Sequence, residues 1–190
     1  GLDSSVAGEA ETAYAKAGHT VISNASNHRM DPQVPLVIPE INPDHFELVR
    51  SQPGPGAIIT NSNCSSMFLA MALAPIHRAF GLKRVQVTTM QAISGAGYPG
   101  VASMDILGNV IPYIRNEEEK LEEESAKMLG TLAGDHVDPA PFVVSAQCNR
   151  VPVFDGHTET VSVELVQKAS AADVARVLSE FRDMPQAPGV

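Results

Sequence analysis

Apolar and polar residues over the first sixty positions change in blocks that are typical of short helices and strands. Residues 4–18 place Val6, Tyr14 and several alanines on one helical face, with Ser4 or Ser5 as the cap and Gly18 as the stop. Three strand-like runs follow, HTVISN, PLVIPEIN and AIIT. The pattern predicts alternating helices and parallel strands, which is half of an α/β sheet.

The rest of the chain shows longer strands with a period of two. Three runs alternate apolar and polar residues, as strands with one solvated face do, namely residues 83–93, 141–148 and 157–168. A glutamate-rich helix is predicted over 116–132, and most of its glutamates are expected on a solvated face. A last amphipathic helix, capped by Ser170, is predicted over 171–181, with loop over 184–190. This part therefore reads as α+β.

Composition and charge narrow the class of protein. The chain has 190 residues, is 44% hydrophobic and carries a formal net charge of −9. The negative charge argues against nucleic acid as a partner, although a few basic residues can still hold a small anion. The sequence has neither an apolar run long enough for a bilayer nor a secretory start, so we expect a soluble, cytoplasmic protein without a membrane partner.

The stretch NSNCSS places one of only two cysteines between an apolar strand and an apolar helix. A thiol at a helix start faces unpaired backbone N–H groups, which stabilise a thiolate and can also hold an oxyanion. The alternative is a buried cysteine that acts as a small hydrophobe. The local pattern alone does not separate a nucleophilic Cys64 from a buried one. With Cys148 as the only other cysteine, neither a disulfide framework nor a metal site is expected.

One histidine differs from the other five in its setting. His157 follows the turn residues Asp155 and Gly156 at the mouth of a long strand, and Arg150 ends the preceding strand. Catalytic groups are often held on turns by a rigid sheet. His157 is therefore the candidate partner base for Cys64.

Four motifs together resemble one family. NSNCSS, TTMQAISGAG, EEEK and CNRVPVFDGHTE occur in the order and approximate spacing of aspartate-semialdehyde dehydrogenases, particularly the archaeal and fungal branch. The cysteine motif alone would also fit related acyl-phosphate reductases. The agreement of four motifs favours Cys64 as a nucleophile.

The resemblance implies catalytic roles for three residues. Cys64 would attack the substrate carbonyl and carry the acyl group as a thioester, and His157 would act as acid and base. Gln91 would orient the reacting group, although by spacing alone it is simply a polar residue on a strand.

The resemblance also implies a substrate-binding set. Arg150 would grip the substrate carboxylate, which suits the two parallel hydrogen bonds of a guanidinium. Glu117 would lie near the substrate ammonium, and Lys120, three residues later on the same helical face, near phosphate. Arg29 would bind the transferred phosphate, and Asn63 belongs to the same set.

A turn next to the site is the implied cofactor contact. Ser94 and Gly95 match a turn that approaches the nicotinamide, where a missing side chain permits close backbone contact. The choice of NADP as the cofactor rests on the resemblance alone.

The implied reaction is the NADPH-dependent reductive dephosphorylation of L-4-aspartyl phosphate to L-aspartate 4-semialdehyde, a step towards lysine, threonine and methionine. A homodimer or homotetramer, paired through an extended sheet face, is expected. A malonyl-CoA reductase of the same family is one alternative, because the same cysteine could act on a CoA thioester. A non-catalytic truncated paralogue that serves as an interaction fragment is another.

The implied fold is a partial doubly wound, Rossmann-like half followed by a catalytic domain with a mixed or antiparallel sheet. Residues 1–62 would be the second half of an NADP-binding domain, and residues 63–190 the catalytic and dimerisation domain. The chain lacks a GxGxxG turn, and family members are longer at both ends. We therefore expect a shortened chain that binds NADPH weakly on its own.

Overall fold

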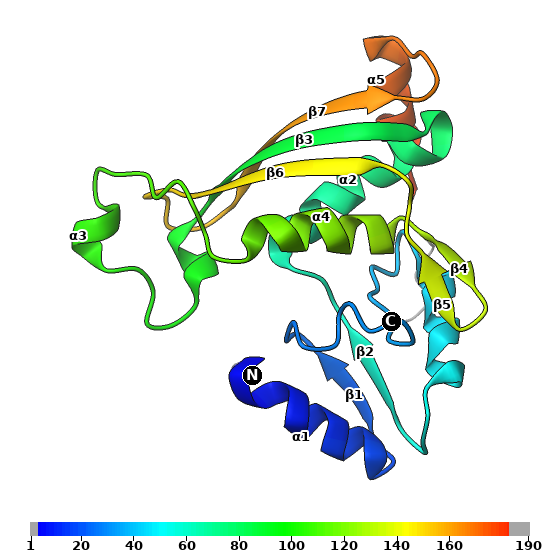
Figure 1. Cartoon of the computed structure of the whole chain (residues 1–190). Helices are drawn as coiled ribbons and strands as arrows, with labels where there is room; N and C mark the ends of the chain where they lie inside the picture. The colour runs from blue at the N-terminus through cyan, green and yellow to red at the C-terminus, as the bar shows by residue number, and fades with distance from the viewer. Residues whose placement is uncertain (1–3, 183–190) are drawn as a thin grey trace.

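The computed structural model describes residues 4–182 and begins with a small α/β unit. Helix α1 (Ser4–Lys16) precedes strand β1 (Thr20–Ser23), and β1 pairs in parallel with β2 (Ala57–Thr60). Figure 1 shows α1 beside these two strands, below the rest of the molecule. The predicted helix and two of the three predicted strands are confirmed. The loop expected over 184–190 lies outside the described residues.

The strand predicted for PLVIPEIN is wrong. Leu36 makes only an isolated bridge to Thr60, and the rest of the run is irregular although its apolar residues Val37, Ile38 and Ile41 are buried. Pro35 and Pro39 have no N–H group to donate to a sheet. Instead the side chain of Asn42 completes the local hydrogen bonding, because it accepts from Ile38 N–H at 2.8 Å and donates to the Leu36 carbonyl at 2.8 Å. A short 3₁₀ helix, η1 (Pro43–Ser51), then leads to β2.

A three-stranded mixed sheet forms the second unit. Its central strand β3 (Leu82–Gln91) runs parallel to β6 (Val143–Arg150) and antiparallel to β7 (Thr158–Leu165). Val85 and Val87 of β3 are buried, whereas Arg84 and Gln86 are exposed. This alternation confirms the prediction of strands with one solvated face.

Two helices cover one face of this sheet. Helices α2 (Cys64–Phe80) and α4 (Glu117–Met128) lie on the same side of it, and the described chain places no helix over the opposite face (Figure 1). Helix α5 (Ala171–Glu180) begins with a capping box on Ser170 and contacts α2. The core between the helices and the sheet is apolar and includes Leu69, Leu73, Val85, Val87, Leu121 and Val144.

The glutamate-rich helix ends earlier than predicted, at Met128 rather than near residue 132. A β-hairpin of β4 (Thr131–Ala133) and β5 (His136–Asp138) follows instead. Gly134 turns the hairpin at a φ of 68°, a conformation that favours glycine. The sequence did not reveal this hairpin, because strands of only three residues are too short to show an alternating pattern.

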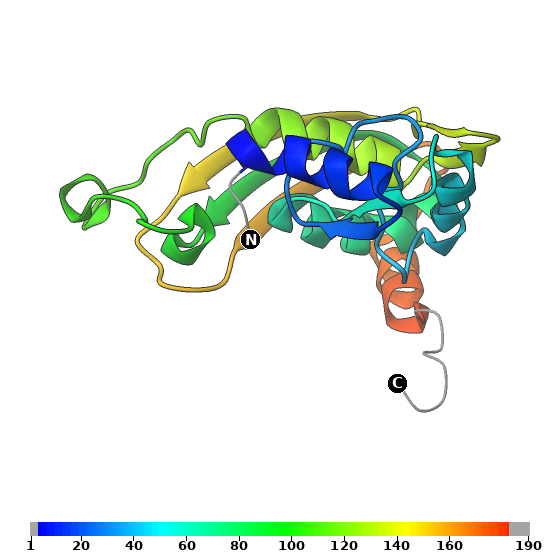
Figure 2. The ribbon, with the colours of Figure 1, turned by 90° about the horizontal axis from the view of Figure 1, so that it is seen from below.

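Short helices complete the fold. Helix η2 (Ile93–Ala96) follows β3, and α3 (Ser103–Ile106) belongs to a segment that extends away from the body at the end opposite α5, as Figure 2 also shows. None of the helices in the described part of the chain is long and apolar enough to cross a membrane. The predicted fold class, α/β plus α+β with a Rossmann-like start and a mixed sheet, is confirmed.

Candidate active site

Cys64 is the first residue of α2, as the sequence predicted. Asn63 precedes it as the N-cap, and its Oδ1 accepts the backbone N–H groups of Ser65 at 3.0 Å and Ser66 at 3.2 Å. Capping by an asparagine oxygen satisfies amides that the helix itself leaves unpaired. Cys64 is exposed enough for a substrate to reach it, although protein atoms surround much of its thiol.

The structure brings His157 to the thiol across ninety-three positions of sequence. The Sγ atom of Cys64 lies 3.3 Å from Nε2 of His157. On the other side of the ring, the backbone N–H of Ala92 donates to Nδ1 at 3.1 Å. Since Nδ1 accepts, the neutral ring carries its hydrogen on Nε2, facing the sulfur.

Burial governs the charge of both groups. Burial and the nearby Glu117 carboxylate raise the pKa of the Cys64 thiol, against the lowering effect of the Ser65 and Cys64 backbone amides. Burial and the Arg150 guanidinium lower the pKa of His157. The position at a helix start had indicated a stabilised thiolate, but desolvation raises the pKa of Cys64 by more than the backbone amides lower it. The resting pair is therefore a neutral thiol beside a neutral imidazole at pH 7.

Arg150 and Gln91 form a row across the sheet next to His157. They are direct partners in the parallel pairing of β6 with β3. Arg150 is buried, and its Nη1 donates to the Ala92 carbonyl at 2.7 Å. Gly95 packs against this row, since a Cβ built there would lie 2.7 Å from Cε1 of His157 and 2.9 Å from Nη1 of Arg150. The backbone at Gly95 thus fits closely only because it has no side chain.

Glu117 connects two of the predicted substrate residues with Gln91, which was predicted as a catalytic residue. Its carboxylate accepts from Lys120 Nζ at 2.6 Å, from Asn63 Nδ2 at 2.8 Å and from Gln91 Nε2 at 3.4 Å. Although burial raises it, these hydrogen bonds hold the pKa of Glu117 below its ordinary value. Glu117 is therefore a buried anion beside the thiol.

Arg29 is held by a glutamate that the sequence analysis did not single out. Its Nη1 lies 2.9 Å from Oε1 of Glu124, and Oε2 of Glu124 accepts the Asn63 N–H at 2.7 Å. Glu124 thus connects Arg29 to the cap of the cysteine helix. The sequence could have pointed to Glu124 through its spacing, because a residue seven positions after Glu117 lies on the same face of α4.

A hollow beside this group is large enough for a small anionic ligand. Its volume is about 500 Å³, and its lining includes Arg29, Asn63 and Lys120. Three of the five residues that the family resemblance links to substrate therefore line one cavity, whereas Arg150 and Glu117 do not contribute to its lining.

The predicted cofactor turn lies on the exposed side of the site. Ser94 and Gly95 are both exposed in η2, and Ser94 N–H donates to the Phe154 carbonyl at 3.1 Å. The roles of these two residues and of the substrate set stay predictions.

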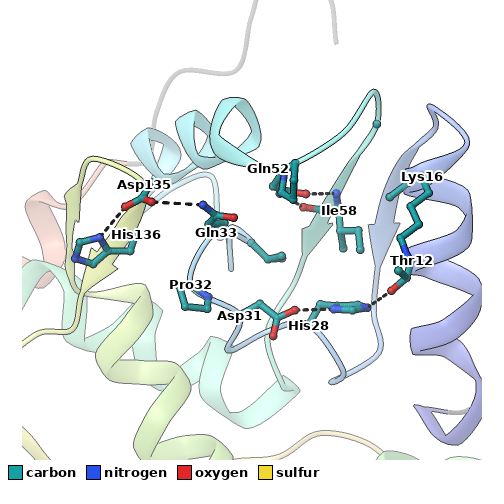
Figure 3. Close-up of a pocket in the computed structure, with 14 residues that line it drawn as sticks. Thr12, Lys16, His28, Asp31, Pro32, Gln33, Gln52, Ile58, Asp135 and His136 are labelled. Atoms are coloured by element: carbon teal, nitrogen blue, oxygen red, sulfur yellow. Dashed lines mark hydrogen bonds and ion pairs between the residues drawn. The ribbon is translucent and has the colours of Figure 1, made fainter.

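A second cavity lies apart from the thiol. It measures about 640 Å³ and is lined by residues of α1, of the segment 28–34, of β2 and of the β4–β5 hairpin. Figure 3 shows His28 between Asp31 and Thr12 on one side, and Asp135 between Gln33 and His136 on the other. Cys64 and His157 do not contribute to its lining.

The fold and this site define the class of proteins that join a Rossmann-like unit to a catalytic unit with a cysteine at a helix start and a histidine on the sheet. The chain belongs to the semialdehyde dehydrogenase family. Residues 73–189 match its dimerisation domain, and residues 1–49 match its NAD-binding domain.

Relatives and solved structures agree with this membership. The chain is 49% identical to the aspartate-semialdehyde dehydrogenase of Methanothermobacter thermautotrophicus over 193 residues, which covers 100% of this chain and 55% of the relative. It is 45% identical to that of Schizosaccharomyces pombe, covering 100% of this chain and 56% of the relative. A crystal structure of the Candida albicans enzyme with NADP matches with a TM-score of 0.87 and 42% identity, covering 96% of this chain and 55% of that one. The chain spans about half the length of the curated relatives that it matches.

Proposed function

We propose that this chain carries the catalytic site of an NADP-dependent aspartate-semialdehyde dehydrogenase, which converts L-4-aspartyl phosphate to L-aspartate 4-semialdehyde. The observation that supports this most directly is the 3.3 Å contact between Cys64 Sγ and His157 Nε2. Around it lie groups suited to each part of the substrate, and the relatives share this activity by name.

The substrate would be held by three charged side chains. Arg150 would take the α-carboxylate, Glu117 the ammonium and Lys120 the phosphate. Arg29 lies near Lys120 in the same hollow, but Glu124 already occupies part of its guanidinium. Arg29 would therefore add to the positive charge that Lys120 offers a phosphate, with part of its guanidinium held by Glu124.

The acylation step would form a bond from Cys64 Sγ to the substrate carbonyl carbon and break the bond from that carbon to the phosphate oxygen. The thiol proton leaves with the departing phosphate. While charge develops on the carbonyl oxygen, the Nε2–H of His157 can stabilise it, whereas the Ser65 and Ser66 N–H groups are already taken by the Asn63 side chain. The product of this step is a thioester on Cys64.

The acid role proposed for His157 has a structural requirement. A ring that gives a proton to the sulfur must first carry hydrogens on both nitrogens. Because Nδ1 accepts the Ala92 N–H at 3.1 Å, that hydrogen bond has to open before the ring becomes an acid. Until it opens, His157 serves as a hydrogen-bond donor to the sulfur.

The residues beside the thiol fit a nicotinamide. Ser94 and Gly95 are exposed, and the Gly95 backbone packs closely against His157 because it has no side chain, so this turn would present its backbone to a nicotinamide bound beside the sulfur. NADPH, when bound, supplies the hydride that reduces the thioester. The chain's own part is to orient the acyl group and to return a proton to the sulfur.

The domain division and the assembly belong to the same proposal. Residues 1–62 would form part of the nucleotide-binding domain, and residues 63–190 the catalytic and dimerisation domain. The solvated face of the β6–β3–β7 sheet is the proposed contact between two copies, because helices cover its other face. A homodimer through this face is the simplest assembly, and a homotetramer would need a second contact.

Acylation without cofactor tests the function in this chain. The protein is incubated with L-4-aspartyl phosphate, and the labelled peptide is located by mass spectrometry. We expect one aspartyl group on Cys64, none on Cys148, and loss of the label in Cys64→Ser but not in Cys148→Ser. Labelling by malonyl-CoA instead would favour a CoA-dependent reductase, and no acylation by either compound would contradict the proposal.

A further inference from the structure

The buried carboxylate of Glu124 holds two groups that belong to different ends of the proposed substrate site. Its Oε1 accepts from Nη1 of Arg29 at 2.9 Å, and its Oε2 accepts the backbone N–H of Asn63 at 2.7 Å. Asn63 directly precedes Cys64 in the chain and caps the cysteine helix. One side chain therefore joins the arginine proposed for the phosphate to the residue before the nucleophile.

Helix α4 holds Arg29 from both ends of that residue. While Glu124 accepts from the guanidinium, Nζ of Lys127 donates to the Arg29 carbonyl at 2.7 Å. Arg29, Glu124 and Lys127 are all buried, so separating these charged hydrogen-bond partners is costly. The Nε atom of Arg29 is buried too and has no hydrogen-bond partner among the described residues. The arginine is thus fixed in place and still keeps a donor for an anion.

Helix α4 holds Asn63 at two points as well. Besides the backbone contact with Glu124, the Nδ2 atom of Asn63 donates to Oε2 of Glu117 at 2.8 Å. Because both carboxylates lie on one helix, Asn63 cannot move along α4 without breaking two hydrogen bonds. The start of α2 and Arg29 therefore share one rigid support.

Only a carboxylate can make the link between Arg29 and Asn63. Both of its oxygens accept hydrogen bonds, whereas a glutamine amide offers one acceptor and one donor group. In Glu124→Gln, the N–H of either Arg29 or Asn63 would face an NH₂ group, and that contact would be lost. The substitution thus breaks the link while it changes the shape of the side chain very little.

We propose that Glu124 is a positioning residue, which fixes the phosphate end of the substrate site relative to the Cys64 thiol by holding Arg29 and Asn63 at the same time. The proposal rests on the proposed function, in which Cys64 is the nucleophile and Arg29 meets the phosphate. It names a residue outside the set that the family motifs indicate.

Breaking the link should slow attack on a substrate that carries a phosphate, because the carbonyl and the thiol are then misaligned. Binding itself should not weaken, since the loss of a negative charge beside Arg29 favours a phosphate. The limiting rate of acylation should therefore fall, and the half-saturating concentration should not rise. Iodoacetamide has no phosphate, so its reaction with Cys64 should not slow.

The first experiment measures acylation of Cys64 at increasing L-4-aspartyl phosphate concentration and, separately, alkylation of Cys64 by iodoacetamide. In Glu124→Gln we expect the limiting rate of acylation to fall about tenfold, with no loss in the rate of alkylation. Glu123→Gln is the matched control, because Glu123 is the exposed neighbour on the same helix. Acylation and alkylation that slow equally would show that Glu124 only supports the helix, and would overturn the proposal, as would an unchanged acylation rate.

A double variant separates positioning of Arg29 from a general structural role. Arg29→Met removes the partner through which Glu124 is proposed to act. Glu124→Gln should then cause no further loss of acylation, because two residues that act as a unit do not have additive effects. Losses that multiply in the double variant would overturn the proposal. Circular dichroism shows whether each variant is folded.

A last measurement does not depend on acylation. Inorganic phosphate is titrated into nitrogen-15-labelled protein, and the backbone amide signal of Asn63 is followed by NMR. A phosphate on Arg29 competes with Glu124 for the guanidinium and so changes the hydrogen bond from Asn63 to Glu124. We expect the signal to move in the native protein and in Glu123→Gln, and to move much less in Glu124→Gln.

The two measurements distinguish failure of this proposal from failure of the proposed function. An Asn63 signal that phosphate leaves in place in the native protein, or moves equally in all three proteins, would overturn the positioning role. A native Cys64 that aspartyl phosphate does not acylate, together with the expected movement of the Asn63 signal, would contradict the proposed function and leave the link from Arg29 to Asn63 in place.

Discussion

Gly95 shows how one missing side chain shapes the site. The sequence analysis assigned it to a turn near the cofactor, and that role stays a prediction. The structure adds a second reason for glycine, because the backbone there approaches both His157 and Arg150. Even the smallest side chain would have to displace the imidazole or the guanidinium.

Gly95→Ala should therefore impair the chemistry without unfolding the protein. A Cβ 2.7 Å from Cε1 of His157 cannot be accommodated unless the ring moves. We expect acylation of Cys64 by aspartyl phosphate to slow at least about tenfold, since misplacement of about 1 Å is enough for such a loss. Ala96→Ser in the same turn is the control. An unchanged acylation rate in Gly95→Ala would show that the ring has another position to occupy.

Helices α2 and α4 together build the binding region. The start of α2 presents the cysteine, and α4 directs one face towards it with Glu117 and Glu124, both buried. Further along this face Lys127 donates to the carbonyls of Arg29, Asp31 and Val34 at 2.7, 2.8 and 2.9 Å. The charge run is exposed at three of its six glutamates, Glu119, Glu122 and Glu123, which is fewer than the predicted majority, and its other face joins the two units.

The N-cap of α2 gives the prediction for this element. Asn63→Ala removes the acceptor for two amides and the donor to Glu117. We expect the free energy of unfolding in urea to fall by about 1–2 kcal/mol. Asn63→Ser, which keeps a capping oxygen, should lose less. Asn109→Ala is the control, because the exposed Asn109 side chain donates only to the Asp105 carbonyl. Equal losses in Asn63→Ala and Asn109→Ala would argue against a special role for the cap.

Within residues 4–182, the arrangement of the elements leaves one sheet face without a covering helix. The helices α2 and α4 cover one side of the β6–β3–β7 sheet (Figure 1), and polar, mostly uncharged side chains point to the other. Thr88 lies near its centre, paired with Gln147 and Thr160 of the neighbouring strands. A polar sheet face of this kind suits a symmetric contact with a second copy.

A charge at the centre of this face should separate the copies. In a twofold contact, Thr88→Lys places two ammonium groups near each other in a desolvated interface. We expect light scattering with size-exclusion chromatography to show a dimer for the native chain and a monomer for Thr88→Lys at micromolar concentration. Thr131→Lys, the same change on the exposed β4 strand, should remain dimeric. A monomeric native chain would refute assembly through this face.

The sequence alone determined the local structure and the reactive residues. Period-two runs predicted β3, β6 and β7, and the NSNCSS stretch predicted a cysteine at a helix start, because both depend on neighbours in the chain. The prediction from sequence was wrong at PLVIPEIN, where two prolines prevent strand pairing and the Asn42 side chain supplies the hydrogen bonds instead. It also missed the short β4–β5 hairpin.

Only the tertiary structure decided which of these residues act together and in what charge state. His157 reaches Cys64 through the register of β7 on β3, and Glu124 reaches Asn63 through the packing of α4 on α2. Burial then raises the pKa of Cys64, against what the helix start alone indicated. Desolvation depends on atoms brought together from distant parts of the chain, so local sequence carries no direct signal of it.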